Sequence, residues 1–422
     1  MARTKALKIK AGALQYVIFI GVVIALLVFA FILLSYTQKQ FRLLNKQFIQ
    51  SVKETDELLI TLNGKGLTEN QTSELQTNKV SSVMTQQWGL FEIATATAGY
   101  RNQKFTKFAL LGGHLSNRNS LYLQDEDQPL VVVGNTKIEG AIRLPKQGIK
   151  RGSIAGTSYS GSQLYYGVAQ LSTAELPKFL GREALRELVF ANEASTEQES
   201  FDLTADLVLT NSFNEPTKVF QTEGFVNLSN VTLTGNILIK SNLGISLDAS
   251  SSLTDVILIA PKISIGDQVR GNFQALATEE IIVGKACELA YPSVLVVYQN
   301  PFSVELPNQP SEERNSDLII GSKTRVKGLV AFFSEKEQEP YKTQISLEKE
   351  TRVVGEVYCQ GNLELQGSVV GSVITQGFMA NQFGNLYKNH IYNGQILTHQ
   401  FPKEYVGLWL DTYQKKVVKW LY

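Results

Sequence analysis

Short apolar segments recur along the second half of this chain at a nearly constant spacing. Each segment has the pattern apolar-x-apolar, and successive segments begin 19, 18, 18, 37, 27 and 18 positions apart. Four intervals are close to 18, 37 is close to two such steps, and 27 is one step plus an insertion that the polar run 334–342 can supply. Strands that repeat at a fixed period are typical of solenoids, in which each repeat buries its apolar face by stacking on its neighbours. The segments begin at Val226, Ile245, Ile263, Ile281, Leu318, Ile345 and Leu363.

Three similar heptapeptides also occur in the chain: TRVVGEV at 351–357, TRVKGLV at 324–330 and TKIEGAI at 136–142. Alternate side chains of a strand point to opposite faces, so Val353, Gly355 and Val357 share one apolar face. The opposite face carries Glu356 and is expected to meet water. A glycine repeated among inward β-branched residues indicates a bend, or a neighbouring backbone too close for a Cβ atom.

These patterns predict a mainly β protein with a parallel β-helix, or solenoid, over residues 225–380. A β-sandwich or a set of hairpins is the alternative, because these folds are also rich in short strands. Hairpins should show Asn-Gly or Asp-Gly turns. Beyond the N-terminal helical region, Asn393-Gly394 is the only such pair. The spacing therefore favours the solenoid.

A second strong signal lies at residues 11–36, AGALQYVIFIGVVIALLVFAFILLSY, which contain no charged residue. About 20 apolar residues span a bilayer, so the run predicts a transmembrane helix that anchors the protein. A cleaved secretory signal is the alternative, but its apolar region would be shorter and followed by a small-x-small cleavage site. Four basic residues precede the run and three follow it closely, which favours a cytoplasmic N-terminus with the bulk of the chain outside, in the periplasm.

The helix is expected to continue beyond the membrane as an amphipathic stalk over 37–63, since Phe41, Leu44, Phe48 and Val52 recur at helical spacing. A helix over 13–62 would be about 75 Å long. Residues 64–224 are expected to be β-rich, with a detached strand in 130–145, one helix near 174–191 that begins with a capping box at Ser172 and Glu175, and a loop at 192–200. A C-terminal cap is expected over 381–422.

The N-terminal segment KIKAGALQYVIF has a short basic leader, Gly12 and a long apolar helix. It resembles the leader and first helix of type IV pilins and type II secretion pseudopilins. The resemblance implies cleavage between Gly12 and Ala13. This sequence has Val17 at the fifth mature position, where that family usually has glutamate.

The V-x-G-x-V segments at 353–357 and 369–373 resemble those of bactofilins, which are polymer-forming proteins built as a right-handed β-helix. The resemblance covers about a third of the chain. It implies a right-handed coil geometry here. Bactofilins are cytoplasmic and lack the long anchor, so a membrane-tethered cytoplasmic scaffold becomes one alternative function.

Chemistry-bearing motifs are sparse. Neither His114, His390 nor His399 has metal-ligand spacing to another histidine or to a cysteine, which predicts solvated or hydrogen-bonded side chains. Cys287 and Cys359 fall on inward positions and are expected to be small buried residues, with a disulfide as the alternative. Aspartates on adjacent coils could cleave glycosides, because hydrolysis needs two facing acids, although turn positions explain them equally. They are Asp202, Asp206, Asp248, Asp255 and Asp267.

The sequence thus predicts no catalytic, cofactor-binding or metal-binding residue and no cofactor. A net charge of +1 over 422 residues gives no electrostatic footprint for nucleic acid. We expect a membrane-anchored structural or assembly protein of the bacterial cell envelope, and the N-terminal resemblance implies a minor-pilin-like component. Its expected partners are the membrane, through 11–36, and other pilin-like subunits or an envelope polysaccharide. The alternatives are a carbohydrate-active β-helix enzyme and the tethered scaffold.

Overall fold

A computed structural model describes residues 11–61, 71–72, 79–100, 103–190, 203, 206–299, 316–336, 338–411 and 413–421. Contacts divide the chain into two compact units, and each is described by itself. The first holds the chain up to Leu58, Gln71–Val83 and Ala96–Thr106, and the second holds Leu59–Asn70, Met84–Thr95 and Lys107–Tyr422.

The described residues are mainly β. The helices are α1 (Ala11–Thr61) and α2 (Arg182–Phe190). The first strands are β1 (Gln71–Thr72), β2 (Lys79–Trp88), β3 (Phe91–Tyr100), β4 (Gln103–His114), β5 (Leu121–Leu123), β6 (Leu130–Val133), β7 (Lys137–Leu144), β8 (Ile149–Arg151), β9 (Ser153–Ile154), β10 (Thr157–Ser158), β11 (Tyr166–Leu171), β12 (Val208–Asn211), β13 (Lys218–Thr222) and β14 (Phe225–Leu228). The others are β15 (Thr232–Ser241), β16 (Gly244–Leu247), β17 (Ser252–Ile265), β18 (Arg270–Val283), β19 (Glu288–Gln299), β20 (Ser316–Ile320), β21 (Arg325–Ser334), β22 (Thr343–Leu347), β23 (Arg352–Leu365), β24 (Ser368–Gln382), β25 (Asn385–Lys388), β26 (His390–Tyr392), β27 (Gln395–Leu397) and β28 (Gln414–Leu421).

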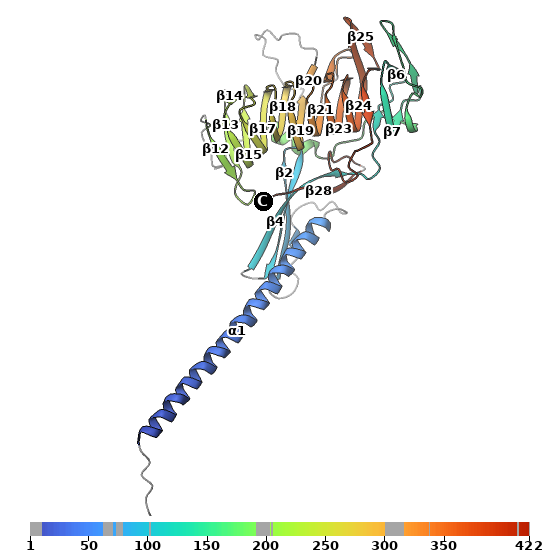
Figure 1. Cartoon of the computed structure of the whole chain (residues 1–422). Coiled ribbons are helices and arrows are strands. Elements are labelled where there is room, and N and C mark those ends of the chain that lie inside the picture. Colours follow the sequence, from blue (N-terminus) through green and yellow to red (C-terminus); the bar gives the residue numbers. More distant parts are fainter. Residues whose placement is uncertain are drawn as a thin grey trace, which may run out of the picture. The chain divides into compact units, whose positions relative to one another are not determined.

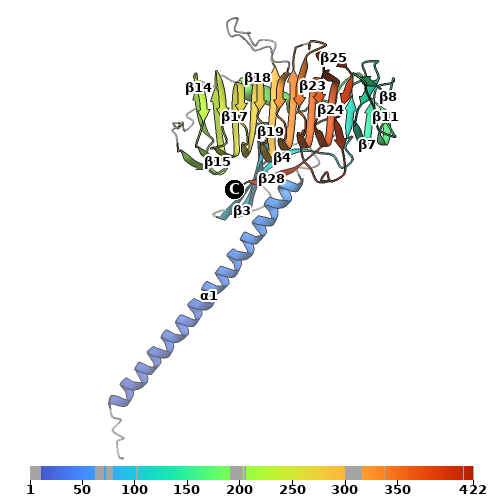
Figure 2. The same cartoon turned by 45° about the horizontal axis from the view of Figure 1, so that its top comes forward.

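Most strands of the second unit pair in parallel and form one closed hydrogen-bonded system, seen as side-by-side arrows in Figure 2. The register matches the alignment of the apolar segments, except that the interval of 37 is one step and not the two that the sequence suggested, because Ile281 pairs directly with Leu318. All six alignments of neighbouring segments occur as Cα partners: Val226 with Ile245, Ile245 with Ile263, Ile263 with Ile281, Ile281 with Leu318, Leu318 with Ile345, and Ile345 with Leu363. The polar run 334–342 begins at the end of β21 and precedes β22, as the interval of 27 predicts. Residues 300–315, which fall within the interval of 37, lie outside the described residues.

The parallel stack extends beyond the predicted limits of 225–380. β12 and β13 pair in parallel with β15 at one end. At the other end β24 pairs with β5 and β27, β27 pairs with β7, and β7 pairs with β11. Figure 1 shows β24 and β7 close together at this end. Of the segment 130–145, which was expected to hold a detached strand, β7 is therefore part of the stack, whereas β6 pairs with β26 and β8 in a separate sheet. The C-terminal region is not simply a cap, because β27 joins the stack and β28 pairs antiparallel with β4.

The inner core consists of aliphatic side chains that point into the stack from every turn. Val353 and Val357 are fully buried, as the alternation predicts. Cys287 and Cys359 are also buried and both are free thiols, so the expectation of small buried residues is confirmed. Burial raises the pKa of the Cys287 thiol, which disfavours the reactive thiolate.

The repeated glycines stack directly on one another. Gly328, Gly355 and Gly371 are paired in register and have φ angles of +143°, +153° and +144°. A Cβ atom on Gly355 would lie 1.8 Å from the carbonyl oxygen of Gly328, and one on Gly371 would lie 2.0 Å from that of Gly355. Both explanations offered by the sequence hold: the backbone adopts a conformation that suits glycine, and the neighbouring backbone excludes a side chain.

A second apolar layer covers one outer face of the stack. Outward side chains such as Leu276, Val296 and Tyr358 pack against residues outside the stack, including Phe91 and Phe179. This layer corrects one prediction. Glu356 was expected at the surface but is 2% exposed, because the segments around Arg118 and Leu408 cover that part of the face.

The first unit contains most of α1, which runs without interruption from Ala11 to Thr61 and confirms the predicted continuous helix (Figure 1). The helix is long and apolar enough to cross a membrane, and its apolar window is entirely exposed. In the stalk, Phe41 remains exposed, whereas Ser51 and Thr55 are buried. The buried stripe therefore begins further along the helix than the sequence suggested.

The predicted helix near 174–191 exists but is shorter, because α2 begins only at Arg182. The capping box at Ser172 and Glu175 is not a helix start. The Tyr122 hydroxyl instead donates a hydrogen bond to the Glu175 carbonyl oxygen at 2.9 Å and lies 2.7 Å from the Thr173 hydroxyl. These contacts hold the segment 173–181 in a non-helical conformation on the outer face of the stack. The loop expected at 192–200 lies outside the described residues.

Candidate functional site

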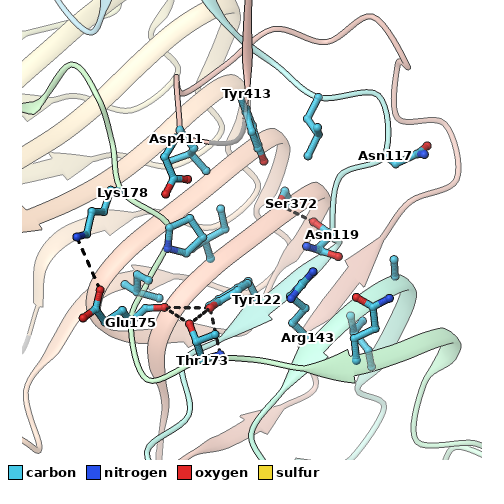
Figure 3. Close-up of a pocket in the computed structure, with 18 of the residues that line it drawn as sticks. Asn117, Asn119, Tyr122, Arg143, Thr173, Glu175, Lys178, Ser372, Asp411 and Tyr413 are labelled. Atoms are coloured by element: carbon cyan, nitrogen blue, oxygen red, sulfur yellow. Dashed lines mark hydrogen bonds and ion pairs between the residues drawn. The ribbon is translucent and has the colours of Figure 1, made fainter.

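Several polar side chains converge on a cleft of about 720 Å³ in the second unit, shown in Figure 3. Its walls come from the segment after β4, from β5, β7, β11 and β24, from the segment 173–178, and from Leu410, Asp411 and Tyr413. The cleft therefore lies where the first strands of the stack meet its last long strand. Its volume falls within the range of about 300–1,000 Å³ that is typical of small-ligand sites.

The floor of the cleft is rigid. Tyr122, Ser372 and Ile374 are buried outward residues of the paired strands β5 and β24. The Ser372 hydroxyl donates a hydrogen bond of 2.6 Å to the Asn119 carbonyl oxygen, which fixes the segment before β5 against β24. Tyr122 anchors the opposite rim through Thr173, whose backbone N–H donates to the tyrosine hydroxyl at 3.2 Å. Side chains that line the cleft thus start from well-fixed backbone.

Several polar side chains in the cleft make no hydrogen bond or ion pair with any other described residue. Arg143 on β7 is half-buried, and in Figure 3 its guanidinium points toward Asn119. The side-chain amides of Asn117, Asn119 and Gln170 and the hydroxyl of Tyr413 are also uncommitted within the described part of the chain. Polar groups that converge on a cleft without partners of their own are available to a ligand.

Acidic groups lie on the side of the cleft away from Arg143. Glu175 and Asp411 both line it and are exposed, and Lys178 lies 3.8 Å from a Glu175 carboxylate oxygen (Figure 3). An exposed ion pair of this length contributes little to stability. Hence Glu175 also remains able to accept hydrogen bonds from a ligand.

A buried ion pair supports the cleft from behind Tyr413. The guanidinium of Arg118 contacts the Glu356 carboxylate, and their side chains are only 6% and 2% exposed. The Arg118 guanidinium also lies 4.9 Å from the ring centroids of both Tyr405 and Tyr413. Burial raises the pKa of Tyr413, so its hydroxyl stays protonated at neutral pH and can donate a hydrogen bond.

A second cleft, of about 780 Å³, adjoins the first and shares Glu175, Leu176 and Lys178 with it. Its lining is rich in amide side chains from the segment after β5, the run 334–342 and the outer faces of β23 and β24. The amides belong to Gln124, Gln338, Gln360 and Gln376. The two clefts together form a polar surface on both sides of the segment 173–178.

The aspartates considered for catalysis have structural partners. Asp248 accepts hydrogen bonds from the Ser229 hydroxyl at 2.7 Å and the Ser250 backbone N–H at 2.9 Å, and hydrogen bonds from these two serines lower its pKa. Asp267 accepts from the Lys285 backbone N–H at 2.7 Å. These carboxylates order turns between strands, as the alternative reading of the sequence suggested.

The other three aspartates do not gather at a common site. Asp255 pairs with Lys419 at 2.6 Å. Asp206 accepts a hydrogen bond from the Asn230 side chain. Asp202 lies outside the described residues.

The sequence predicted hydrogen-bonded histidines, and all three are hydrogen-bonded. His114 Nδ1 lies 3.0 Å from the Tyr405 carbonyl oxygen, and His390 Nδ1 lies 2.7 Å from the Lys388 carbonyl oxygen. His399 Nδ1 lies 2.9 Å from a Glu139 carboxylate oxygen. Burial lowers the pKa of His390. Within the described ranges, no group of three or more His, Cys, Asp or Glu side chains could hold a metal ion.

The chain matches no protein-family model, and comparisons with curated proteins and with solved structures found no significant match. Functional reasoning therefore rests on the geometry. Sequence reasoning missed Arg143, Asn119 and Tyr413, because they come from three segments that only the stacking of β5 and β7 onto the far end of the stack brings together.

Proposed function

We propose that this protein is a membrane-anchored structural or assembly component of the bacterial cell envelope, of the kind that minor pilins represent, and that it presents a β-solenoid surface outside the cytoplasmic membrane. The observation that carries the proposal is the combination, in one chain, of an exposed apolar helix of membrane-spanning length and a closed stack of parallel strands. Presentation needs both parts: the helix fixes the place, and the stack supplies a rigid surface.

We further propose that the stack is a right-handed parallel β-helix. Strands of the stack pair in parallel with strands further along the chain, in several cases 18 positions away, so the chain must cross over between them. Parallel crossover connections are right-handed in about 98% of cases. The V-x-G-x-V resemblance to bactofilins is consistent with this hand.

The anchor is tested by fractionation. The full-length protein should stay in the membrane fraction after carbonate washing, because the apolar window is exposed along its whole length. Cleavage after Gly12 would leave the span intact. Recovery of soluble protein that begins near residue 37 would instead show a cleaved signal peptide.

Function is tested by complementation of a deletion strain. A variant that lacks residues 1–63 should fail to complement, and the same variant fused to an unrelated single-pass anchor should succeed. Asp248→Asn and Asp267→Asn should leave the phenotype intact, because these carboxylates order turns. Complementation by the anchorless variant would contradict the proposal, and a cytoplasmic reporter signal from a C-terminal fusion would favour a tethered scaffold.

A carbohydrate-active enzyme is the second candidate, since Glu175 and Asp411 line one cleft. Glycoside hydrolysis uses two carboxyl groups on either side of the scissile bond. Turnover of a polysaccharide by the purified protein, abolished by Glu175→Gln and by Asp411→Asn, would establish it. We expect no turnover, because both carboxylates lie on exposed irregular segments rather than on the rigid floor.

A further inference from the structure

We propose that the 720 Å³ cleft binds an acidic saccharide, with a sugar carboxylate paired to Arg143 and sugar hydroxyl groups bonded to the surrounding amides and acids. The proposal rests on the proposed function, of which it specifies the partner as a uronate-containing envelope polysaccharide. It follows from the charge, the hydrogen-bonding capacity and the shape of the cleft, in that order.

Charge points first to an anion. The guanidinium of Arg143 is half-buried in the cleft and forms no ion pair with any described residue. Arginine presents a planar fork of N–H donors that matches a carboxylate with two parallel hydrogen bonds. Its place on β7, which pairs in parallel with β5, β11 and β27, gives the fork a fixed base.

The acids across the cleft limit how much negative charge the ligand carries. Glu175 and Asp411 would repel a densely charged polyanion such as a nucleic acid or a polyphosphate. The same carboxylates accept hydrogen bonds from neutral hydroxyl groups. A molecule with one carboxylate among many hydroxyls satisfies both walls of the cleft.

The remaining uncommitted groups suit sugar hydroxyls. The amides of Asn117, Asn119 and Gln170 each offer both donors and an acceptor, and a sugar hydroxyl both donates and accepts. The protonated Tyr413 hydroxyl adds a further donor. Apolar atoms of Ile374 and neighbouring residues face the same space and can cover the C–H surface of a sugar ring.

The shape of the site suits a chain of sugars rather than a single compact ligand. The first cleft is open and continues past Leu176 into the second, amide-lined cleft. A polymer could therefore lie across several turns of the stack while its acid group is fixed at Arg143. A surface that holds a polymer and does not cleave it fits a presenting or assembling protein.

The proposal is tested by titration calorimetry on the full-length protein in detergent micelles. The probes are short oligouronides, namely an oligogalacturonide, an oligoglucuronide and an oligomannuronate, each beside its methyl ester. We expect at least one acid form to bind wild type, and Arg143→Gln to weaken its binding about ten- to a hundredfold, as for loss of a charge-assisted hydrogen bond. Arg143→Lys should give an intermediate loss, because the charge remains but the fork is gone.

Matched controls separate a local effect from a general loss of positive charge. Arg325→Gln removes an exposed arginine from β21, outside the cleft, and should leave affinity unchanged. The methyl ester, which lacks the charge, should bind wild type and Arg143→Gln equally weakly. Unchanged affinity in Arg143→Gln, equal binding of acid and ester by wild type, or no binding of any oligouronide would each overturn the proposal.

A peptide ligand is the competing outcome. Arg143-dependent binding of peptides with a free C-terminal carboxylate, without binding of oligouronides, would overturn the saccharide assignment. Failure here is distinguishable from failure of the proposed function, which is judged by whether the anchorless variant complements. The protein can present a β-solenoid surface even if the cleft does not bind an acidic saccharide.

Discussion

Replacing Glu356 with glutamine preserves the shape of the side chain but should strongly lower the free energy of unfolding. Glu356 is 2% exposed and contacts the buried guanidinium of Arg118, and its other oxygen accepts a 2.7 Å hydrogen bond from the Leu408 backbone N–H. Glutamine keeps the volume but removes the charge that balances Arg118. The guanidinium then retains only neutral partners, among them the carbonyl oxygens of Gly113 at 3.0 Å and Tyr405 at 2.9 Å.

The expected magnitude follows from the cost of an unbalanced buried charge. Removing one partner of a buried ion pair costs about 3–5 kcal/mol. The two tyrosine rings at 4.9 Å offset part of that loss through cation–π attraction, which is worth up to about 2 kcal/mol at desolvated sites. We therefore expect Glu356→Gln to lower the free energy of unfolding by about 3 kcal/mol, near the lower end of the range.

Urea unfolding of the purified protein measures the loss, and hydrogen exchange at the Leu408 amide reports it locally, because that amide is bonded to Glu356. The exposed pair Arg270–Glu288 is the matched control. Its atoms lie 3.7 Å apart and its side chains are 79% and 57% exposed, so Glu288→Gln should cost no more than about 1 kcal/mol.

The double change Arg118→Met with Glu356→Leu should cost less than Glu356→Gln alone, because no charge remains buried. If Glu356→Gln is as stable as Glu288→Gln and exchange at Leu408 is unchanged, the buried charge is not balanced by this pair and the reasoning fails.

Two further predictions concern the stack itself. Gly355→Ala should destabilise the protein by at least about 1–3 kcal/mol, the usual cost of a glycine-only backbone conformation, because the new Cβ would also meet the Gly328 carbonyl oxygen. Gly224→Ala, where the nearest atom would be 3.6 Å away, should be close to neutral in the same denaturation assay; equal losses would refute the close-contact explanation. Burial raises the pKa of Asp317, although Lys342 lies 2.6 Å away, so the folded state holds the proton more tightly than the unfolded state. Wild type should then lose stability relative to Asp317→Asn as pH rises above about 4, and parallel pH profiles of the two unfolding free energies would contradict this.

The sequence predicted those parts of the fold that depend on neighbouring turns. Val353 and the aligned residue of each adjacent strand obey the same period, so local spacing sets their register and burial. Glu356 escaped prediction because its burial depends on Arg118, which lies far away in the sequence and approaches from outside the stack. Alternation tells which face a residue occupies, but not what covers that face.

The cleft escaped prediction for the same reason. Arg143 is one of the charged residues on the outward face of its heptapeptide region and has no motif around it. It becomes a candidate ligand group only because β7 joins the stack close to β24 and because Asp411 and Tyr413 line the same cleft. The turn role of Asp248 was one of two explanations open from the sequence, and its partners, Ser250 and Ser229, lie in the same or the preceding turn.

The pairing of β5 with β24 also constrains how the chain acquires its structure. Ser372 bonds to Asn119 across 253 positions, so the strands that are synthesised early at this end of the stack have partners that are synthesised late. Synthesis proceeds from the N-terminus at about 5–20 residues per second, so β5 and β7 leave the ribosome many seconds before β24. During that interval the edges of β5 and β7 that later pair with β24 and β27 are unpaired and open to wrong partners. A chaperone that shields nascent strands would act on residues 121–171. A nonsense mutation even late in the gene would remove the strands with which β5 and β7 pair.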